Sequence, residues 1–159
     1  MDFHELEKIS LISRIWIIAA AVVNEALKFE QDRRGGFLCI ADLKSGSPIA
    51  VLRCASPPAA KVQKYIYYSR EKAERLWTNP EHDSAWESRN PNEGKVEGAI
   101  RGEYHILAFS GLSPAMDEAV VLMVAEMTCE LPVNVVAALA TLSNNQHFQK
   151  LKNAARSVC

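Results

Sequence analysis

Two pairs of short β-favouring segments constrain the fold of this chain more than any other feature of its sequence. The first pair, Phe37–Leu43 and Pro48–Cys54, flanks a stretch of lysine, serine and glycine that is typical of a turn. The second pair, Val96–Ile100 and Glu103–Ser110, flanks an arginine–glycine pair that favours a tight turn. Both faces of the last segment are largely apolar, which indicates a central strand covered on two sides. The sequence therefore predicts two β-hairpins.

Helices are predicted before, between and after the hairpins, because apolar residues recur there at three- and four-residue spacing. The predicted helices are Asp2–Asp32, Ala59–Trp77, Pro114–Glu130, Val133–Leu142 and Gln146–Val158. On the second of these helices, Lys72 is expected to face water. This order indicates an α+β fold, with a single antiparallel sheet built from two hairpins, helices packed on it and a C-terminal helical tail. A chain of 159 residues fits a single domain, with a core over about residues 1–130 and the tail over 131–159.

The first predicted helix carries a long apolar stripe. The stripe begins at Phe3 and Leu6, passes through Trp16 and continues to Val22 and Ala26. A glycine pair then ends the helix, because glycine accepts the left-handed conformation that closes helices. This stripe and the apolar tail exceed what one small sheet can cover. We therefore expect a homo-oligomer.

Composition and charge exclude several classes of protein. Hydrophobic residues make up 48% of the chain and charged residues 23%, which is the balance of a globular protein. The net charge of −1, with both signs mixed along the chain, gives no support to nucleic-acid binding. The longest apolar run, Ile15–Val23, is too short to span a bilayer, and acidic residues before it argue against a secretory signal. We expect a cytoplasmic protein without a nucleic-acid or membrane partner.

The four cysteines, Cys39, Cys54, Cys129 and Cys159, are scattered and form no metal-binding motif. A turn centred on residues 46 and 47 would place Cys39 opposite Cys54, with the two thiols side by side on one face. The alternative is that both are small apolar residues that stay reduced in the cytosol. No metal site is predicted.

Three local patterns resemble the GlcG/HbpS-like family, which includes the C-terminal domain of PduO-type proteins. The first pattern runs from Ile40-Ala41-Asp42 through a glycine turn to Leu52-Arg53. The second is Lys72-Ala73 in the helix that follows. The third is Gly98-Ala99-Ile100 together with Phe109–Glu118, similar to the family's closing strand, Ser-Gly turn and acidic helix start. This chain differs from the family in the residues inserted between the two parts of the third pattern.

The resemblance implies a profilin-like fold and a small ligand-binding protein, often oligomeric. It also implies haem or a corrinoid as the ligand, whereas a small anion is a candidate from the residues discussed next. The cofactor stays unassigned, because no motif places a haem-ligating histidine. The resemblance favours a binding module over an enzyme.

Five residues are candidates for a ligand-binding site. Arg53, at a strand end, could clamp a carboxylate or phosphate, or pair with a structural acid. His82 belongs to a long polar loop over residues 81–95, which we interpret as a functional or mobile segment, and His105 lies in the predicted central strand. Ser110 and Asp117 flank the start of a helix, whose positive end could hold an anion unless Asp117 already occupies it.

No nucleotide-binding, phosphate-loop, zinc-protease, calcium-loop or nucleophile-elbow motif occurs in the sequence. The main hypothesis is a non-enzymatic small-molecule-binding module, with its ligand between the long loop and the sheet. One alternative is a homo-oligomeric assembly module. Another is an enzyme whose active-site residues are far apart in sequence.

Overall fold

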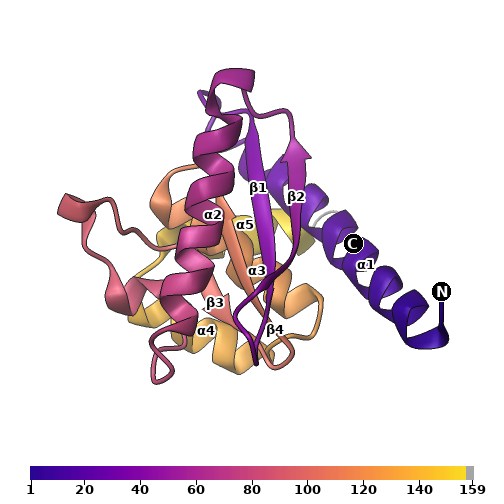
Figure 1. The fold of residues 1–159 in the computed structure, drawn as a ribbon. Helices are drawn as coiled ribbons and strands as arrows, with labels where there is room; N and C mark the ends of the chain where they lie inside the picture. Colours follow the sequence, from indigo (N-terminus) through magenta and orange to yellow (C-terminus); the bar gives the residue numbers. More distant parts are fainter. Residues whose placement is uncertain (157–159) are drawn as a thin grey trace.

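The structure, a computed structural model, describes residues 1–156 of the 159-residue chain. Within this part the fold is α+β, with one open four-stranded antiparallel sheet and five α-helices packed on it (Figure 1). The strands are β1 (Gly35–Asp42), β2 (Pro48–Ala55), β3 (Ala99–Arg101) and β4 (His105–Ser110). The helices are α1 (Phe3–Ala26), α2 (Val62–Trp77), α3 (Pro114–Met127), α4 (Val133–Leu142) and α5 (Gln146–Arg156). The predicted fold class is confirmed.

The two hairpins join into one sheet with the strand order β2-β1-β4-β3. Antiparallel pairing of the central strands runs from Phe37 opposite Ser110 to Asp42 opposite His105. Every residue of β4 is buried, as the apolar character of both its faces predicted. Ser110 therefore lies at the end of a rigid central strand, where the chain turns into α3.

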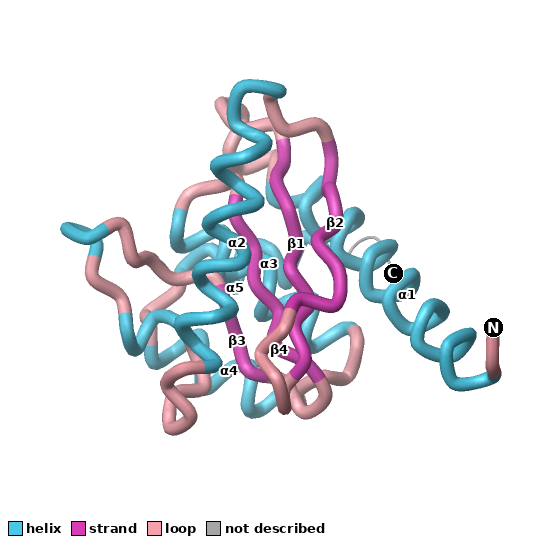
Figure 2. Tube along the Cα trace, in the orientation of Figure 1, coloured by secondary structure: helices cyan, strands magenta, loops and turns pink. Residues whose placement is uncertain are grey.

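Helices cover both faces of the sheet (Figure 2). α2 lies alone on one face, over a small cluster that includes Cys39, Leu76 and Ile106. α1, α3 and α5 lie on the other face, over a larger cluster that includes Leu38 and Phe109. α4 packs against α3. Buried residues of α4 and α5 belong to this larger cluster, so the C-terminal helices are part of the main core.

α1 ends at Ala26, six residues before the predicted end of the first helix. The chain turns there because Glu30 reaches α3, where its carboxylate accepts hydrogen bonds from the backbone N–H and the hydroxyl group of Ser113. The predicted apolar stripe of this helix is buried at its C-terminal end and exposed at its N-terminal end. Ala26 is fully buried, whereas Phe3 is 74% exposed. None of the helices in residues 1–156 has the length and apolar character needed to cross a membrane.

Of the two alternatives for Cys39 and Cys54, the one that places the thiols side by side is excluded. Cys39 pairs with Val51, and Cys54 pairs with Gly36, so the two thiols lie on opposite faces of the sheet. The cause is the turn, in which the Asp42 carboxylate accepts hydrogen bonds from the backbone N–H and hydroxyl groups of Ser45 (2.7 and 2.9 Å). These contacts centre the turn earlier than the sequence predicted and shift the register.

The second hairpin has a shorter first strand and a wider turn than predicted. The carboxylate of Glu130 accepts hydrogen bonds from the backbone N–H groups of Tyr104 (2.9 Å) and His105 (3.2 Å). In addition, the N–H of Glu103 donates to the backbone carbonyl of Glu130. Because Glu130 satisfies these donors, residues 103 and 104 leave the ladder and β4 begins at His105.

Candidate functional site

A buried ion pair joins α2 to the start of α3. The ammonium group of Lys72 donates to Asp117 Oδ2 at 2.9 Å and to the carbonyl oxygen of Phe109 at 2.8 Å. Asp117 Oδ1 accepts the backbone N–H of Leu112 at 2.9 Å. Lys72 is 1% exposed and Asp117 is 2% exposed. Two opposite charges are therefore held in the interior, at the end of the central strand.

Lys72 reaches this position because it belongs to the buried side of α2. Tyr65, Ser69 and Leu76 lie on the same side, at the spacing of one helical face. Gly98 leaves the space for the ammonium group, since a Cβ atom at residue 98 would lie 2.8 Å from Lys72 Nζ. The positive φ of 125° at Gly98 also favours glycine. We had expected Lys72 to face water, and that expectation is wrong.

Burial raises the pKa of Asp117 to about 6 from its ordinary value of 3.8. The positive charge of Lys72 and the hydrogen bonds from Lys72 and Leu112 act in the opposite direction. The nearby carboxylate of Glu30 adds to the increase. The proton affinity of Asp117 is therefore set mainly by removal from water, and this carboxyl group titrates near neutral pH.

A pocket of about 240 Å³ opens onto the ion pair. Its walls combine basic side chains, tyrosines and the turn between β4 and α3. The lining residues are Arg33, Lys64, Tyr65, Tyr68, Lys72, Gly94, Val96, Ser110, Gly111, Leu112, Pro114 and Asp117. We call this space the Lys72 pocket. Three basic side chains and one carboxyl group line it, so a bound anion would meet an excess of positive charge.

Close backbone packing fixes one corner of the Lys72 pocket. A Cβ atom at Gly36 would lie 2.1 Å from the carbonyl oxygen of Ser110, and one at Gly111 would lie 2.4 Å from the carbonyl oxygen of Gly35. Only glycine at these positions lets the start of β1 approach the end of β4 so closely. The backbone of the Ser110–Leu112 turn is therefore held rigidly where it borders the pocket.

The long loop over residues 81–95 is ordered by the guanidinium group of Arg75. Arg75 donates to the carbonyl oxygens of Ala85 (3.0 Å) and Val96 (2.5 Å) and to the hydroxyl group of Ser88 (2.9 Å). Short 3-10 turns at Ala85–Ser88 and Pro91–Glu93 give the loop local structure. Its last part reaches the Lys72 pocket through Gly94. The loop thus contributes a wall to the pocket.

Of the five candidates from the sequence, Ser110 and Asp117 line the Lys72 pocket. Arg53 lies on β2, with its guanidinium group 5.7 Å from the centre of the Phe37 ring, and pairs with no acid among the described residues. His105 lies at the opposite end of β4 from Ser110, roughly 17 Å away along the strand.

The two histidines predicted as ligand-binding residues, His82 and His105, lie among contacts within the fold and not in the pocket. His105 Nδ1 lies 2.5 Å from Glu130 Oε1, in a buried pair that closes the turn before β4. His82 follows α2, and its carbonyl oxygen accepts a hydrogen bond from Arg101 at 3.0 Å. The side chain of His82 is partly exposed, with Nδ1 buried and without a hydrogen-bond partner among the described residues. Neither histidine lines the Lys72 pocket.

Four residues that line the pocket were missed by sequence reasoning: Arg33, Lys64, Tyr68 and Lys72. Arg33 is 39 positions before Lys72, so no local pattern connects them. Lys64, Tyr68 and Lys72, however, are four residues apart on α2 and follow one side of the helix. This four-residue spacing, together with Gly98 and the Ser-Gly turn later in the chain, is the sequence signal that could have identified the pocket residues.

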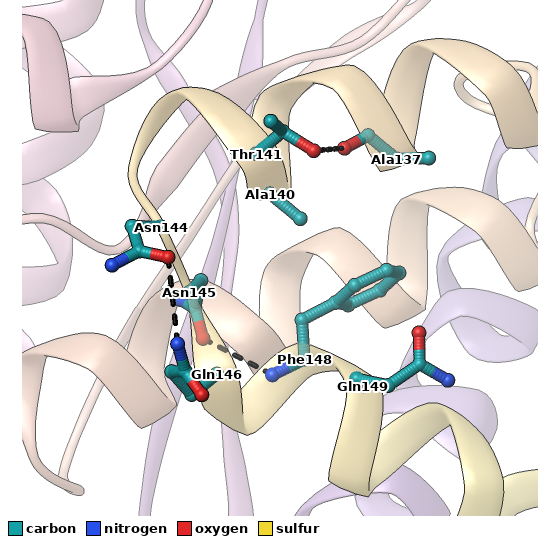
Figure 3. A pocket seen from close by; sticks show the side chains of 8 residues that line it. All are labelled: Ala137, Ala140, Thr141, Asn144, Asn145, Gln146, Phe148 and Gln149. Carbon is teal, nitrogen blue, oxygen red and sulfur yellow. Dashed lines mark hydrogen bonds between the residues drawn. The ribbon is translucent and has the colours of Figure 1, made fainter.

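Three hollows are larger than the Lys72 pocket. The smallest of them, of about 280 Å³, lies beside the turn of the first hairpin and has one basic and one acidic lining residue, Arg70 and Glu74. The remaining two also lack comparable chemistry. One, of about 360 Å³, lies between α4 and α5 and has no charged lining residue (Figure 3). Polar groups there bind their neighbours, as when Thr141 donates to the carbonyl oxygen of Ala137 (3.0 Å). The other, of about 380 Å³, contains Arg75, whose donors already hold Glu71 and the long loop. No group of three or more metal-ligating residues occurs within residues 1–156.

Comparisons of this chain with family models, with curated proteins and with solved structures found no match. The chemistry of the Lys72 pocket is therefore the basis for a functional conclusion.

Proposed function

We propose that this protein is a non-enzymatic binding module that holds a small anion, of the carboxylate or oxyanion class, in the Lys72 pocket. The observation that carries the proposal is the buried ammonium group of Lys72 at the pocket wall. An ammonium group has three donors, and two acceptors, Asp117 and Phe109, engage it among the described residues. In this proposal the ligand accepts a hydrogen bond from the third N–H of the ammonium group.

The rest of the lining supports the same ligand class. Arg33 and Lys64 add positive charge, and the hydroxyl groups of Tyr68 and Ser110 can donate hydrogen bonds. A volume of about 240 Å³ is below the range of roughly 300–1,000 Å³ that encloses drug-sized ligands. This favours a small anion over haem or a corrinoid, the ligands that the family resemblance implies.

The arrangement also favours binding over catalysis. Ser110 forms no hydrogen bond with a histidine or a carboxylate among the described residues, and such a partner is what activates a serine nucleophile. The ammonium group of Lys72 is held by the carboxylate of Asp117 and the carbonyl oxygen of Phe109. Both features suit the recognition of an anion.

Titration of the ¹⁵N-labelled protein with sulfate, phosphate, oxalate and acetate, with acetamide as an uncharged control, tests the proposal. We expect at least one anion, but not acetamide, to shift the amide signals of Gly94, Ser110 and Gly111. Replacing Lys64 by Met should weaken binding about two- to fivefold, since an exposed charge contributes modestly. The matched variant Lys61→Met, which alters an exposed lysine outside the pocket lining, should bind as the wild type does.

Three results would contradict the proposal: no anion shifts these signals, acetamide shifts them equally, or Lys61→Met and Lys64→Met weaken binding alike. A separate titration with hemin addresses the larger ligand. A shifted Soret band that disappears in Lys64→Met would show that the pocket binds a macrocycle instead of a small anion.

A further inference from the structure

One face of α1 is apolar and open to solvent over most of the helix. Phe3 is 74% exposed, Leu6 is 52% exposed and Ile17 is 70% exposed. The N-terminal part of α1 extends beyond the sheet and the other helices (Figure 1). Large apolar side chains are thus collected on a helix face that no described part of the chain covers, as is typical of an interaction surface.

This exposed face is distinct from the face that packs on the sheet. The buried side of α1 contains Ile15, Ala19 and Val22, and towards the N-terminus it continues into the polar residues His4 and Lys8. At 3.6 residues per turn, the apolar residues of the first two turns lie on nearly the opposite side. α1 therefore has two apolar faces, one for its own core and one for another surface.

The exposed face has the spacing of a coiled-coil seam. Phe3, Ser10 and Ile17 are separated by seven residues, as are Leu6, Ser13 and Ala20. When two copies of the helix pair in antiparallel orientation, Phe3 of one lies opposite Ala20 of the other, and Leu6 opposite Ile17. The small side chains of Ser10 and Ser13 meet at the centre, where the helices approach each other.

The charges beside the seam fit this antiparallel arrangement. Glu7 and Arg14 are seven residues apart on the same flank, and both are exposed. In the register just described, Glu7 of each copy lies beside Arg14 of the other, so two opposite-charge contacts form by symmetry. Arg14 has no ion-pair partner within residues 1–156. The carboxylate of Glu7 lies 3.7 Å from Nδ1 of His4 and has no other ion-pair partner in the same part of the chain. A parallel pair would instead bring Glu7 towards Asp2.

We propose that the protein forms a two-fold symmetric dimer in which the exposed faces of two α1 helices pack antiparallel, in register around Ser10 and Ser13. On the second flank of the seam this register places Ile9 beside Trp16 of the other copy, which extends the apolar contact. The chain's net charge of −1 gives little repulsion between copies. The acidic residues Asp2 and Glu7 beside the seam make this face a poor fit for an anionic membrane surface.

Sedimentation equilibrium of the full chain and of charge variants tests the dimer. The wild type should be a dimer, and Glu7→Arg or Arg14→Glu alone should raise the dissociation constant on the order of tenfold, because each creates two like-charge contacts. Mixing Glu7→Arg protein with Arg14→Glu protein should form a heterodimer of wild-type affinity. The double variant should form a homodimer again, since the charges are exchanged on both copies.

A second set of variants tests the apolar seam. Ile17→Glu should give a monomer, whereas Tyr67→Glu, at a residue of α2 that is 64% exposed, should leave the dimer intact. Circular dichroism should show that both variants are folded. A monomeric wild type, equal effects of Ile17→Glu and Tyr67→Glu, or no recovery on mixing the charge variants would overturn the proposal. If the protein is monomeric and sediments with phosphatidylserine vesicles, and Ile17→Glu abolishes this, the partner of the exposed face is a membrane surface and not a second copy of the chain.

Discussion

The buried carboxyl group of Asp117 gives the protein an unusual contribution to pH-dependent stability. Most surface carboxylates are more acidic in the folded state, so their ionisation favours folding. Asp117 behaves in the opposite way, because burial raises its pKa to about 6 from an ordinary value of 3.8. Replacing it by asparagine keeps the size of the side chain and the acceptor for the N–H of Leu112, but removes the titration.

The sign and size of the effect follow from linkage. Between about pH 4 and pH 6 the folded state binds more protons at Asp117 than the unfolded state, so this group's stabilising contribution is lost as the pH rises. The separation between 3.8 and about 6 corresponds to roughly 3 kcal/mol, at about 1.36 kcal/mol per pH unit. The unfolded carboxyl group is already partly ionised at pH 4, so the free energy of unfolding of the wild type, minus that of Asp117→Asn, should decrease by roughly 2 kcal/mol from pH 4 to pH 7.

Urea denaturation of both proteins at half-unit pH intervals measures this difference. Groups that titrate alike in both proteins cancel, including the buried carboxyl group of Glu118, whose pKa burial also raises. In Lys72→Met the titration of Asp117 should move to higher pH, because the favourable charge is gone. A difference that is constant, or that increases with pH, would refute the idea that desolvation dominates at Asp117.

Three further predictions concern the same corner of the fold and the thiols. Gly36→Ala should destabilise the protein by about 1–3 kcal/mol in urea denaturation, since its Cβ would overlap the carbonyl oxygen of Ser110; wild-type stability would contradict the close packing. Cys39 and Cys54 should resist alkylation at pH 8 in the folded protein, because burial raises their pKa values to about 11 and about 12; rapid labelling of either, detected by peptide mapping, would oppose this. The affinity for sulfate, measured by calorimetry, should fall severalfold as the pH rises through about 6, because ionised Asp117 competes for Lys72. In Asp117→Asn the affinity should no longer depend on pH in this range.

The fold could be predicted because its elements depend on local patterns. Short β-favouring apolar runs predicted the positions of β1 and β4, and the Ser113-Pro114 start of α3 was readable from capping preferences. The register of the first hairpin could not be predicted from the sequence, because it depends on the side chain of Asp42. That contact moves the turn centre and changes which face each residue occupies. Composition alone does not determine which turn forms.

The site was harder to predict because its two charges come from distant parts of the chain. Lys72 and Asp117 are separated by 45 positions, and nothing local connects them. A lysine is almost never fully buried without a partner, so an isolated Lys72 in a helix was reasonably assigned to solvent. Its register with Tyr65 and Leu76 argued for burial, but the charge of the side chain outweighed that pattern.

Glycine positions provide the link between the sequence and this site. Gly36, Gly98 and Gly111 each occupy a place where a Cβ atom would overlap a neighbouring atom of the fold. At Gly98 that neighbour is the Lys72 ammonium group, and at Gly36 and Gly111 it is the backbone that borders the pocket. A glycine kept inside or beside a strand weakens it, unless close approach compensates. The backbone therefore leaves room for the buried ammonium group at Gly98 and allows the close approach of β1 and the end of β4 at Gly36 and Gly111.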